Sequence, residues 1–237
     1  MDEIHKLASF VDSLHYHEKI GPEIDPKKGC FPFITISRQA GAGGNALASV
    51  LEEMIQRLHA EPLFRGWQIC GQELCHMIAQ DSKLKDIVES LRRTEYHSHA
   101  EDIISQFIYG GSSQDLVVKK MFHLMRAFAL HGKVILIGRG STFLTRDLPL
   151  GIHIRLEASM ESRVKRMMSA LNVDAKKARE AVEEKDKAKA ELVKTFFHKD
   201  IRDPLLYDIV WNTDRVPIAE IAKLLIEMVR DRAAGIC

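Results

Sequence analysis

The stretch from Phe31 to Leu47 reads FPFITISRQAGAGGNAL, and it decides the fold. It opens with an apolar, β-branched run over Phe31–Ser37, which is typical of a buried strand. After the glycines, apolar residues recur at helical spacing from Leu47 to Leu58 and indicate an amphipathic helix. A helix that starts after a glycine-rich turn presents free N–H groups and a partial positive charge. The segment therefore predicts a site for phosphate.

Further strands and helices alternate along the rest of the chain. Apolar runs predict strands at Lys133–Gly138, Ile152–Leu156 and Tyr207–Trp211. Helical patterns cover about 67–109, 114–131, the segment after Ser159, 174–198 as one helix or a pair, and the segment after Pro217. This alternation predicts an α/β fold whose parallel sheet is covered on both faces.

The first 29 residues are expected to be an appendage. Apolar residues share one helical face over about 3–18, and a segment rich in glycine and proline over 21–29 follows as a linker. We therefore expect an N-terminal helical appendage and linker over 1–29 and one domain over 30–237.

Two phosphate-binding patterns compete for the glycine loop. Gly41–Ala46 satisfies the dinucleotide pattern GxGxxG/A, and Glu61 lies near the distance expected for a ribose-binding acid. However, Arg38–Ala40 lengthens the loop, and Glu61 precedes Pro62 instead of ending a second strand. These features favour a P-loop, while a glycine turn without a ligand stays open. The standard P-loop ends in Gly-Lys-Ser/Thr.

This loop departs from that standard ending. Gly44 stands where the lysine is expected, and Ala46 offers no hydroxyl for magnesium.

Composition limits the classes of partner. The chain has 237 residues, 46% hydrophobic content and a net charge of +1, so no strong global field points to nucleic acid. We find no secretory signal and no apolar run of about 18 residues, which predicts a cytoplasmic protein without a membrane segment. The spacing of the four cysteines matches no zinc or redox motif, so reduced, structural thiols are expected.

Four blocks of sequence, taken in order, resemble the cytidylate kinase-like family, relatives of bacterial cytidylate kinase with an altered P-loop. The blocks are Ile34–Gly44, Val134–Gly140, Ile154–Arg166 and Asp203–Thr213, and the resemblance covers about 31–230. It implies a three-layer P-loop NTPase fold with a helical monophosphate-binding insertion at about 67–110 and a helical lid at about 160–202. It also implies transfer of the γ-phosphate of ATP, with Mg²⁺, to a nucleoside monophosphate, cytidylate or another pyrimidine monophosphate.

Some residues depart from the family pattern. Asn45 stands where the family often has arginine, and Lys189 and Phe196 stand where the lid commonly has arginine and tyrosine. These changes lower the positive charge near the phosphates. A catalytically weak or inactive nucleotide-binding regulatory module is therefore an alternative.

The candidate site residues fall into two groups. Backbone N–H groups of the loop would cradle the donor phosphates, and Arg38 could supply the missing charge. Arg139 follows a buried strand, and the resemblance implies contact with the acceptor. The expected catalytic residues are Arg38, Arg139, Arg163, Arg166 and Asp203. The expected nucleotide-binding residues are Ser37, Gly41, Ala42, Gly43, Gly44, Asn45, Ala46, Lys185 and Lys189.

Several questions stay open at this level. No strand ends in an obvious acidic metal ligand, so the magnesium ligands are unknown, although Ser37 could contribute its hydroxyl. The insertion offers Gln72, Glu73, Arg92 and Arg93 as base or phosphate contacts, and His97 and His99 do not make a metal site by themselves. A dinucleotide oxidoreductase and a kinase for a non-nucleotide acceptor are further alternatives. The sequence also leaves a homo-oligomer open.

Overall fold

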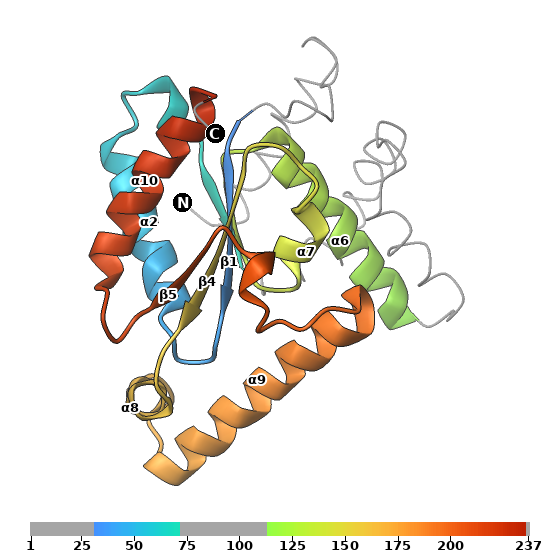
Figure 1. Cartoon of the computed structure of the whole chain (residues 1–237), viewed down its shortest axis with the longest axis vertical. Coiled ribbons are helices and arrows are strands. Elements are labelled where there is room, and N and C mark those ends of the chain that lie inside the picture. Colours follow the sequence, from blue (N-terminus) through green and yellow to red (C-terminus); the bar gives the residue numbers. More distant parts are fainter. Residues whose placement is uncertain (1–30, 72–112, 236–237) are drawn as a thin grey trace.

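The computed structural model describes residues 31–71 and 113–235. The helix expected over 3–18 and most of the expected insertion, including Gln72, Glu73, Arg92, Arg93, His97 and His99, lie outside the described residues. The described part is organised around one sheet (Figure 1).

The sheet is parallel throughout. Its strands are β1 (Phe33–Arg38), β2 (Gln68–Cys70), β3 (Val134–Ile137), β4 (Gly151–Glu157) and β5 (Ile209–Asn212), in the order β2-β3-β1-β4-β5. Ile36 of β1 pairs with Ile137 of β3 on one side and with Ile154 of β4 on the other. The dinucleotide-binding order instead places strand 1 beside strand 2. The sheet order therefore contradicts the dinucleotide alternative.

Helices cover both faces and one end of the sheet. They are α2 (Gly44–Arg57), α6 (Ser113–His131), α7 (Ser141–Thr145), α8 (Met160–Leu171), α9 (Ala175–Phe197) and α10 (Ile218–Ala233), with 3-10 turns at Pro62–Phe64 and Pro204–Leu206. Figure 1 shows α2 and α10 on one face and α6 and α7 on the other. The pair α8 and α9 lies across the end toward which the strands run. The expected three-layer α/β fold is confirmed.

The alternation of side chains along β1 builds the two cores. Ile34 and Ile36 lie in the apolar core shared with α2 and α10. Phe33 points to the other face and lies in the core with α6 and α7. Successive strand residues face opposite sides of the sheet, so β1 contributes side chains to both cores. It also carries the glycine loop at its end.

Two short elements were not predicted. Gln68–Cys70 forms the edge strand β2, although the sequence pattern over 67–109 was interpreted as helical. Three residues are too few to show a period, and only pairing with β3 defines this strand. The five-residue helix α7 also escaped prediction. The charged stretch 174–198 is one helix, α9, whose N-cap Asp174 accepts from the N–H of Lys177.

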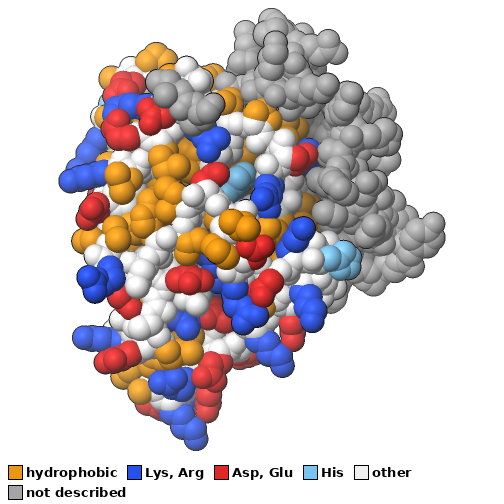
Figure 2. All heavy atoms as spheres, viewed as in Figure 1, with side chains coloured by type: hydrophobic (Ala, Val, Ile, Leu, Met, Phe, Trp, Pro, Cys, Tyr) orange, Lys and Arg blue, Asp and Glu red, His pale blue; other side chains and the backbone are white. Residues whose placement is uncertain are grey.

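Helix α8 also has a side-chain cap. Ser159 caps α8 by accepting a hydrogen bond from the N–H of Ser162. Within the described ranges, no helix has the length and apolar character needed to cross a membrane. The face seen in Figure 2 mixes acidic and basic side chains without a large area of one sign, in keeping with the small net charge.

Candidate phosphate-binding site

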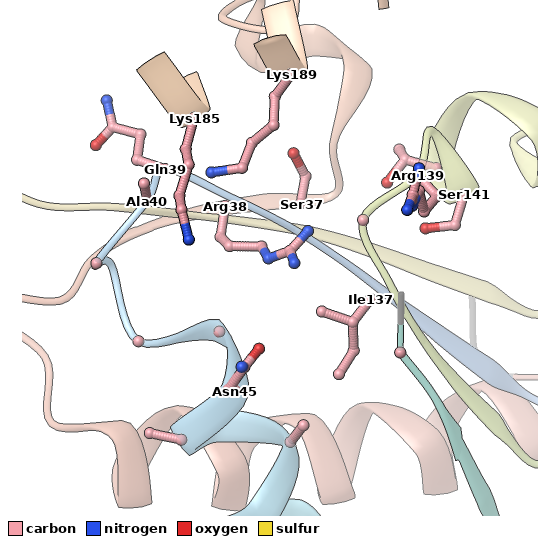
Figure 3. Close-up of a pocket in the computed structure, with 18 of the residues that line it drawn as sticks. Ser37, Arg38, Gln39, Ala40, Asn45, Ile137, Arg139, Ser141, Lys185 and Lys189 are labelled. Carbon is pink, nitrogen blue, oxygen red and sulfur yellow. The ribbon is translucent and has the colours of Figure 1, made fainter. Parts of the chain in front are cut away.

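A cavity of about 1100 Å³ opens where β1 and β3 end. Its walls include the glycine loop after β1, the Gly138–Ser141 turn after β3, and residues of α8 and α9. Figure 3 shows the centre of this cavity. Five basic side chains line it, namely Arg38, Arg139, Arg166, Lys185 and Lys189. Among the described lining residues, Glu52 is the one acidic side chain. The cavity therefore favours an anion.

Three carbonyl groups of the glycine loop are hydrogen-bonded to side chains. Three side chains donate to three successive carbonyl oxygens: Arg163 to Ala40 (3.3 Å), Arg166 to Gly41 (3.2 Å) and Thr213 to Ala42 (3.1 Å). Arg163 and Arg166 come from α8, and Thr213 follows β5. These three acceptors of the loop are thus already hydrogen-bonded within the protein. The loop conformation is set by these contacts.

The first N–H groups of α2 have no side-chain cap. Gly43, the N-cap, has a left-handed backbone (φ 94°), and no side chain caps this terminus. The first N–H groups of a helix have no acceptor within the helix. Those of Gly44, Asn45 and Ala46 therefore remain available at the cavity wall. This is the arrangement that binds phosphate at helix N-termini.

Glycine is required at position 41 for two reasons. Its backbone is left-handed (φ 76°), which favours glycine. A Cβ atom there would lie 2.6 Å from the carbonyl oxygen of Arg163. The loop therefore packs directly against the backbone of α8.

Asp186 of α9 joins the loop to both helices. Its carboxylate accepts from the N–H of Ala40 (2.6 Å), from Arg163 (2.5 Å) and from Lys189 (3.2 Å). Burial lowers the pKa of Lys189, and Asp186 opposes that shift. Ala40 is thus held by Asp186 through its N–H and by Arg163 through its carbonyl oxygen.

Arg38 extends from the end of β1 into the middle of the cavity (Figure 3). A Cβ atom on Gly44 would lie 2.9 Å from the Cγ atom of Arg38. Burial lowers the pKa of Arg38, and repulsion by Arg139 adds to this effect. Within the described residues, no hydrogen bond or ion pair reaches its guanidinium group.

Arg139 lies on the other wall of the cavity (Figure 3). Its backbone is left-handed (φ 55°), between Gly138 (φ 73°) and Gly140 (φ 74°). Its Nε atom is buried and has no hydrogen-bond partner among the described residues. A non-glycine residue in this conformation is uncommon and often marks a functional site.

The hydroxyl of Ser37 is already used within the protein. It accepts from Arg155 (3.1 Å) and lies 3.2 Å from the hydroxyl of Tyr207. Tyr207 donates its own proton to the carbonyl oxygen of Ile201 (2.8 Å), so Ser37 donates to Tyr207. Burial raises the pKa of Tyr207. Sequence patterns gave no signal for Arg155 or Tyr207, because their contacts join distant segments.

The remaining expected site residues have other places. Asp203 is half-buried, caps the 3-10 turn that follows it, and does not line the cavity. Ala42 is buried beneath the loop. Arg163 is also buried, so it holds the loop and does not reach into the cavity. Lys185 and Lys189 reach the cavity from α9 (Figure 3).

No cluster of typical metal-binding side chains marks a magnesium site in the described residues. They include no group of three or more His, Cys, Asp or Glu side chains that could hold a metal ion. The residue directly after the lysine position, where a hydroxyl is standard, is Asn45, and Ala46 comes one residue later. Magnesium is often held largely by substrate phosphates and water. We assign no chemical step to a metal ligand of this chain.

The glycine loop lies within the part of the chain matched by a known family. The model of the cytidylate kinase-like family matches residues 33–215. No curated protein matches the sequence.

Solved structures extend the comparison to the fold. An uncharacterized protein from Eubacterium ventriosum is 19% identical, with a TM-score of 0.65 over 84% of this chain and 98% of that one. Shikimate kinase from Acinetobacter baumannii, solved in complex with shikimate, is 15% identical, with a TM-score of 0.43 over 85% of this chain and 94% of that one. The Eubacterium ventriosum protein shares the fold described above.

Proposed function

The chain belongs to the cytidylate kinase-like family, and on this premise we propose that it transfers the γ-phosphate of ATP to a nucleoside monophosphate. The resemblance seen in the sequence is confirmed, and the family supports a kinase-type phosphotransferase. A pyrimidine monophosphate, cytidylate first, is the acceptor we propose.

The hydrogen bonding of the glycine loop is the observation that supports this proposal. Three loop carbonyls are held by side chains, and the N–H groups of the first turn of α2 remain available at the cavity wall. Phosphoryl transfer requires positioning and neutralisation of charge more than covalent chemistry by the protein. Fixed N–H donors beside several cations supply both.

Each wall of the cavity has a separate role in the proposal. The loop and Arg38 would hold the donor phosphates, and Lys185 and Lys189 would approach them from α9. Arg139 lies on the opposite wall and would bind the phosphate of the acceptor. Arg163 and Arg166 would act as positioning residues, because their hydrogen bonds fix the loop.

An ADP-release assay tests the proposal. Purified protein is given ATP and Mg²⁺ with CMP, dCMP, UMP, AMP or GMP in turn. We expect turnover with one monophosphate, and Arg139→Ala should lower kcat/KM by about 10²- to 10³-fold, as loss of a transition-state donor does. Arg57→Ala is the matched control, since Arg57 is exposed on α2 and pairs with Glu53. Absence of turnover with every monophosphate would overturn the proposed acceptor class.

A second candidate is nucleotide binding without turnover. The observation that favours it is Asn45, which puts an amide where the standard loop has the hydroxyl that holds magnesium. Calorimetry that detects ATP binding, together with no ADP release for any acceptor, would support this candidate.

A further inference from the structure

We infer that Arg38 takes the place of the P-loop lysine. The two glycines at positions 44 and 138 leave the space that the Arg38 side chain occupies. The inference rests on the proposed binding of donor phosphates in this cavity. In this rearranged site, the positive charge comes from Arg38 at the end of β1, instead of from a lysine at position 44 at the start of α2.

The first observation concerns Gly44. This residue stands at the lysine position of the loop, and the Arg38 side chain runs across it. A Cβ atom on Gly44 would meet the Cγ, Cδ and Nε atoms of Arg38 at 2.9, 3.1 and 3.3 Å. These distances are tighter than nearly all real Cβ contacts. Arg38 therefore fills the space where a side chain at position 44 would begin.

The second observation concerns Gly138, which is far from Gly44 in the sequence. A Cβ atom there would coincide with the guanidinium of Arg38, since it would lie 1.8 Å from Nη1 and 2.9 Å from Cζ. Gly138 also has a left-handed backbone (φ 73°). A glycine at the start of α2 and a glycine directly after β3 thus leave room for the aliphatic part and the charged end of one arginine.

The third observation is the lack of an anion beside this charge. In the described ranges, no carboxylate pairs with Arg38, and Arg139 is the charged group that most affects it. By contrast, the fully buried arginines have acidic partners, such as Arg126 with Asp147 and Arg163 with Asp186, whereas Arg38 is partly buried and has none among the described residues. A buried charge without a partner is costly. Because the cavity is open at this point, phosphate is the group that would complete the pairing.

The chemistry of the guanidinium suits this role. Arginine presents several N–H donors in a planar fork and can bind two phosphate oxygens at once, whereas lysine acts as a point charge. The side chain starts at the end of β1, so the sheet fixes its origin. No bond is made or broken by Arg38, which binds and orients the donor phosphates.

Moving the positive charge from position 38 to position 44 tests the inference. The binding of ATP and of inorganic tripolyphosphate is measured by calorimetry, without acceptor, for wild type, Arg38→Met, Gly44→Lys and the double variant Arg38→Met/Gly44→Lys. We expect Arg38→Met to weaken binding about 10- to 100-fold, as loss of a charged hydrogen bond does. The double variant should recover most of that loss, because removal of Arg38 frees the space for a lysine. Gly44→Lys alone should bind weakly, because both side chains would compete for one space.

Two results would overturn the inference. One is wild-type affinity in Arg38→Met. The other is a double variant that is folded, as judged by its melting temperature, but binds no better than Arg38→Met. Arg57→Met serves as the control for loss of an arginine, because Arg57 is the last residue of α2, does not line the cavity and has a side chain that is 79% exposed.

The readout separates this inference from the proposed function. Binding of ATP needs no acceptor and no turnover. If no monophosphate is phosphorylated while binding still depends on Arg38, the proposed reaction fails and the inference stands. If turnover occurs and Arg38→Met leaves binding unchanged, the inference fails and the proposed reaction stands.

Discussion

At the scale of single residues, His153 is the clearest case of an ionisable side chain held neutral. Its Nδ1 atom bonds to the hydroxyl of Thr35 (2.8 Å), and Thr35 bonds to Thr142 (2.9 Å). Its Nε2 atom lies against Gly151, where a Cβ atom would be only 2.7 Å away. Burial lowers the pKa of His153 to about 4, although Asp208 opposes the shift.

This environment predicts loss of stability in mild acid. Between pH 6.5 and about 4 the unfolded chain binds a proton at His153 and the folded chain does not. The free energy of unfolding should therefore be highest above pH 6.5 and fall by roughly 3 kcal/mol toward pH 4 from this group. Urea unfolding across this range measures it.

His153→Asn should remove most of that slope, since an amide can replace the bond to Thr35 without titrating. His198→Asn is the control, because His198 is exposed and its left-handed backbone (φ 51°) suits asparagine. Equal slopes in the two variants would show that His153 does not cause the acid sensitivity.

Arg38 gives a second prediction for a single residue. A partly buried cation without an anionic partner destabilises the ligand-free protein. Arg38→Met should therefore raise the melting temperature without ATP, by roughly 2–4 °C for each kcal/mol gained. A differential scanning fluorimetry trace with a lower melting temperature for Arg38→Met would mean that the guanidinium stabilises the empty cavity.

The sequence predicted some residues of the site and could not predict others. The glycines at 41 and 43 follow a strand and precede a helix, so their backbone role could be inferred from the pattern. The contact of Arg38 with Gly138 joins segments 100 residues apart, and a single sequence carries no signal for it. The same holds for the bond between Ser37 and Tyr207. Local pattern shows where a loop lies, whereas distant packing decides what surrounds it.

At the scale of elements, the ion pair between α8 and α9 should matter more than a similar pair on the surface. Asp186→Ala leaves Arg163, with 7% of its side chain exposed, without its carboxylate. We expect the free energy of unfolding to fall by about 2–4 kcal/mol. Asp200→Ala removes an exposed pair with Arg202 and should leave the denaturation midpoint unchanged. Similar losses in both variants would contradict the role assigned to Asp186.

The long elements were predictable and the short ones were not. The strand at Val134–Ile137 is wholly buried, and such an apolar run has few other interpretations. Helix α10 shows its period over 16 residues. By contrast, β2 has three residues at the sheet edge, and pairing with β3 defines it. Elements whose stability comes from packing leave little trace in their own sequence.

At the scale of the whole molecule, ATP should stabilise the fold. A ligand at about 100 times its dissociation constant adds about 2.7 kcal/mol to the folded state. For a chain of this size, that corresponds to a rise in melting temperature of roughly 5–10 °C. Adenosine, which lacks phosphates, should give little rise at the same concentration. Equal shifts for ATP and adenosine would place the binding energy outside the phosphate cavity.

Helix α9 is one continuous helix, and its contacts limit how it can move. Its C-terminal end packs in the core, where Phe197 stacks on Phe143 with ring centroids 5.2 Å apart. Its middle is tied to the loop through Asp186. The half that begins near Asp174 contacts α8, and its Ala178 and Val182 are buried. A movement of α9 that opened this side of the cavity would therefore also have to move α8.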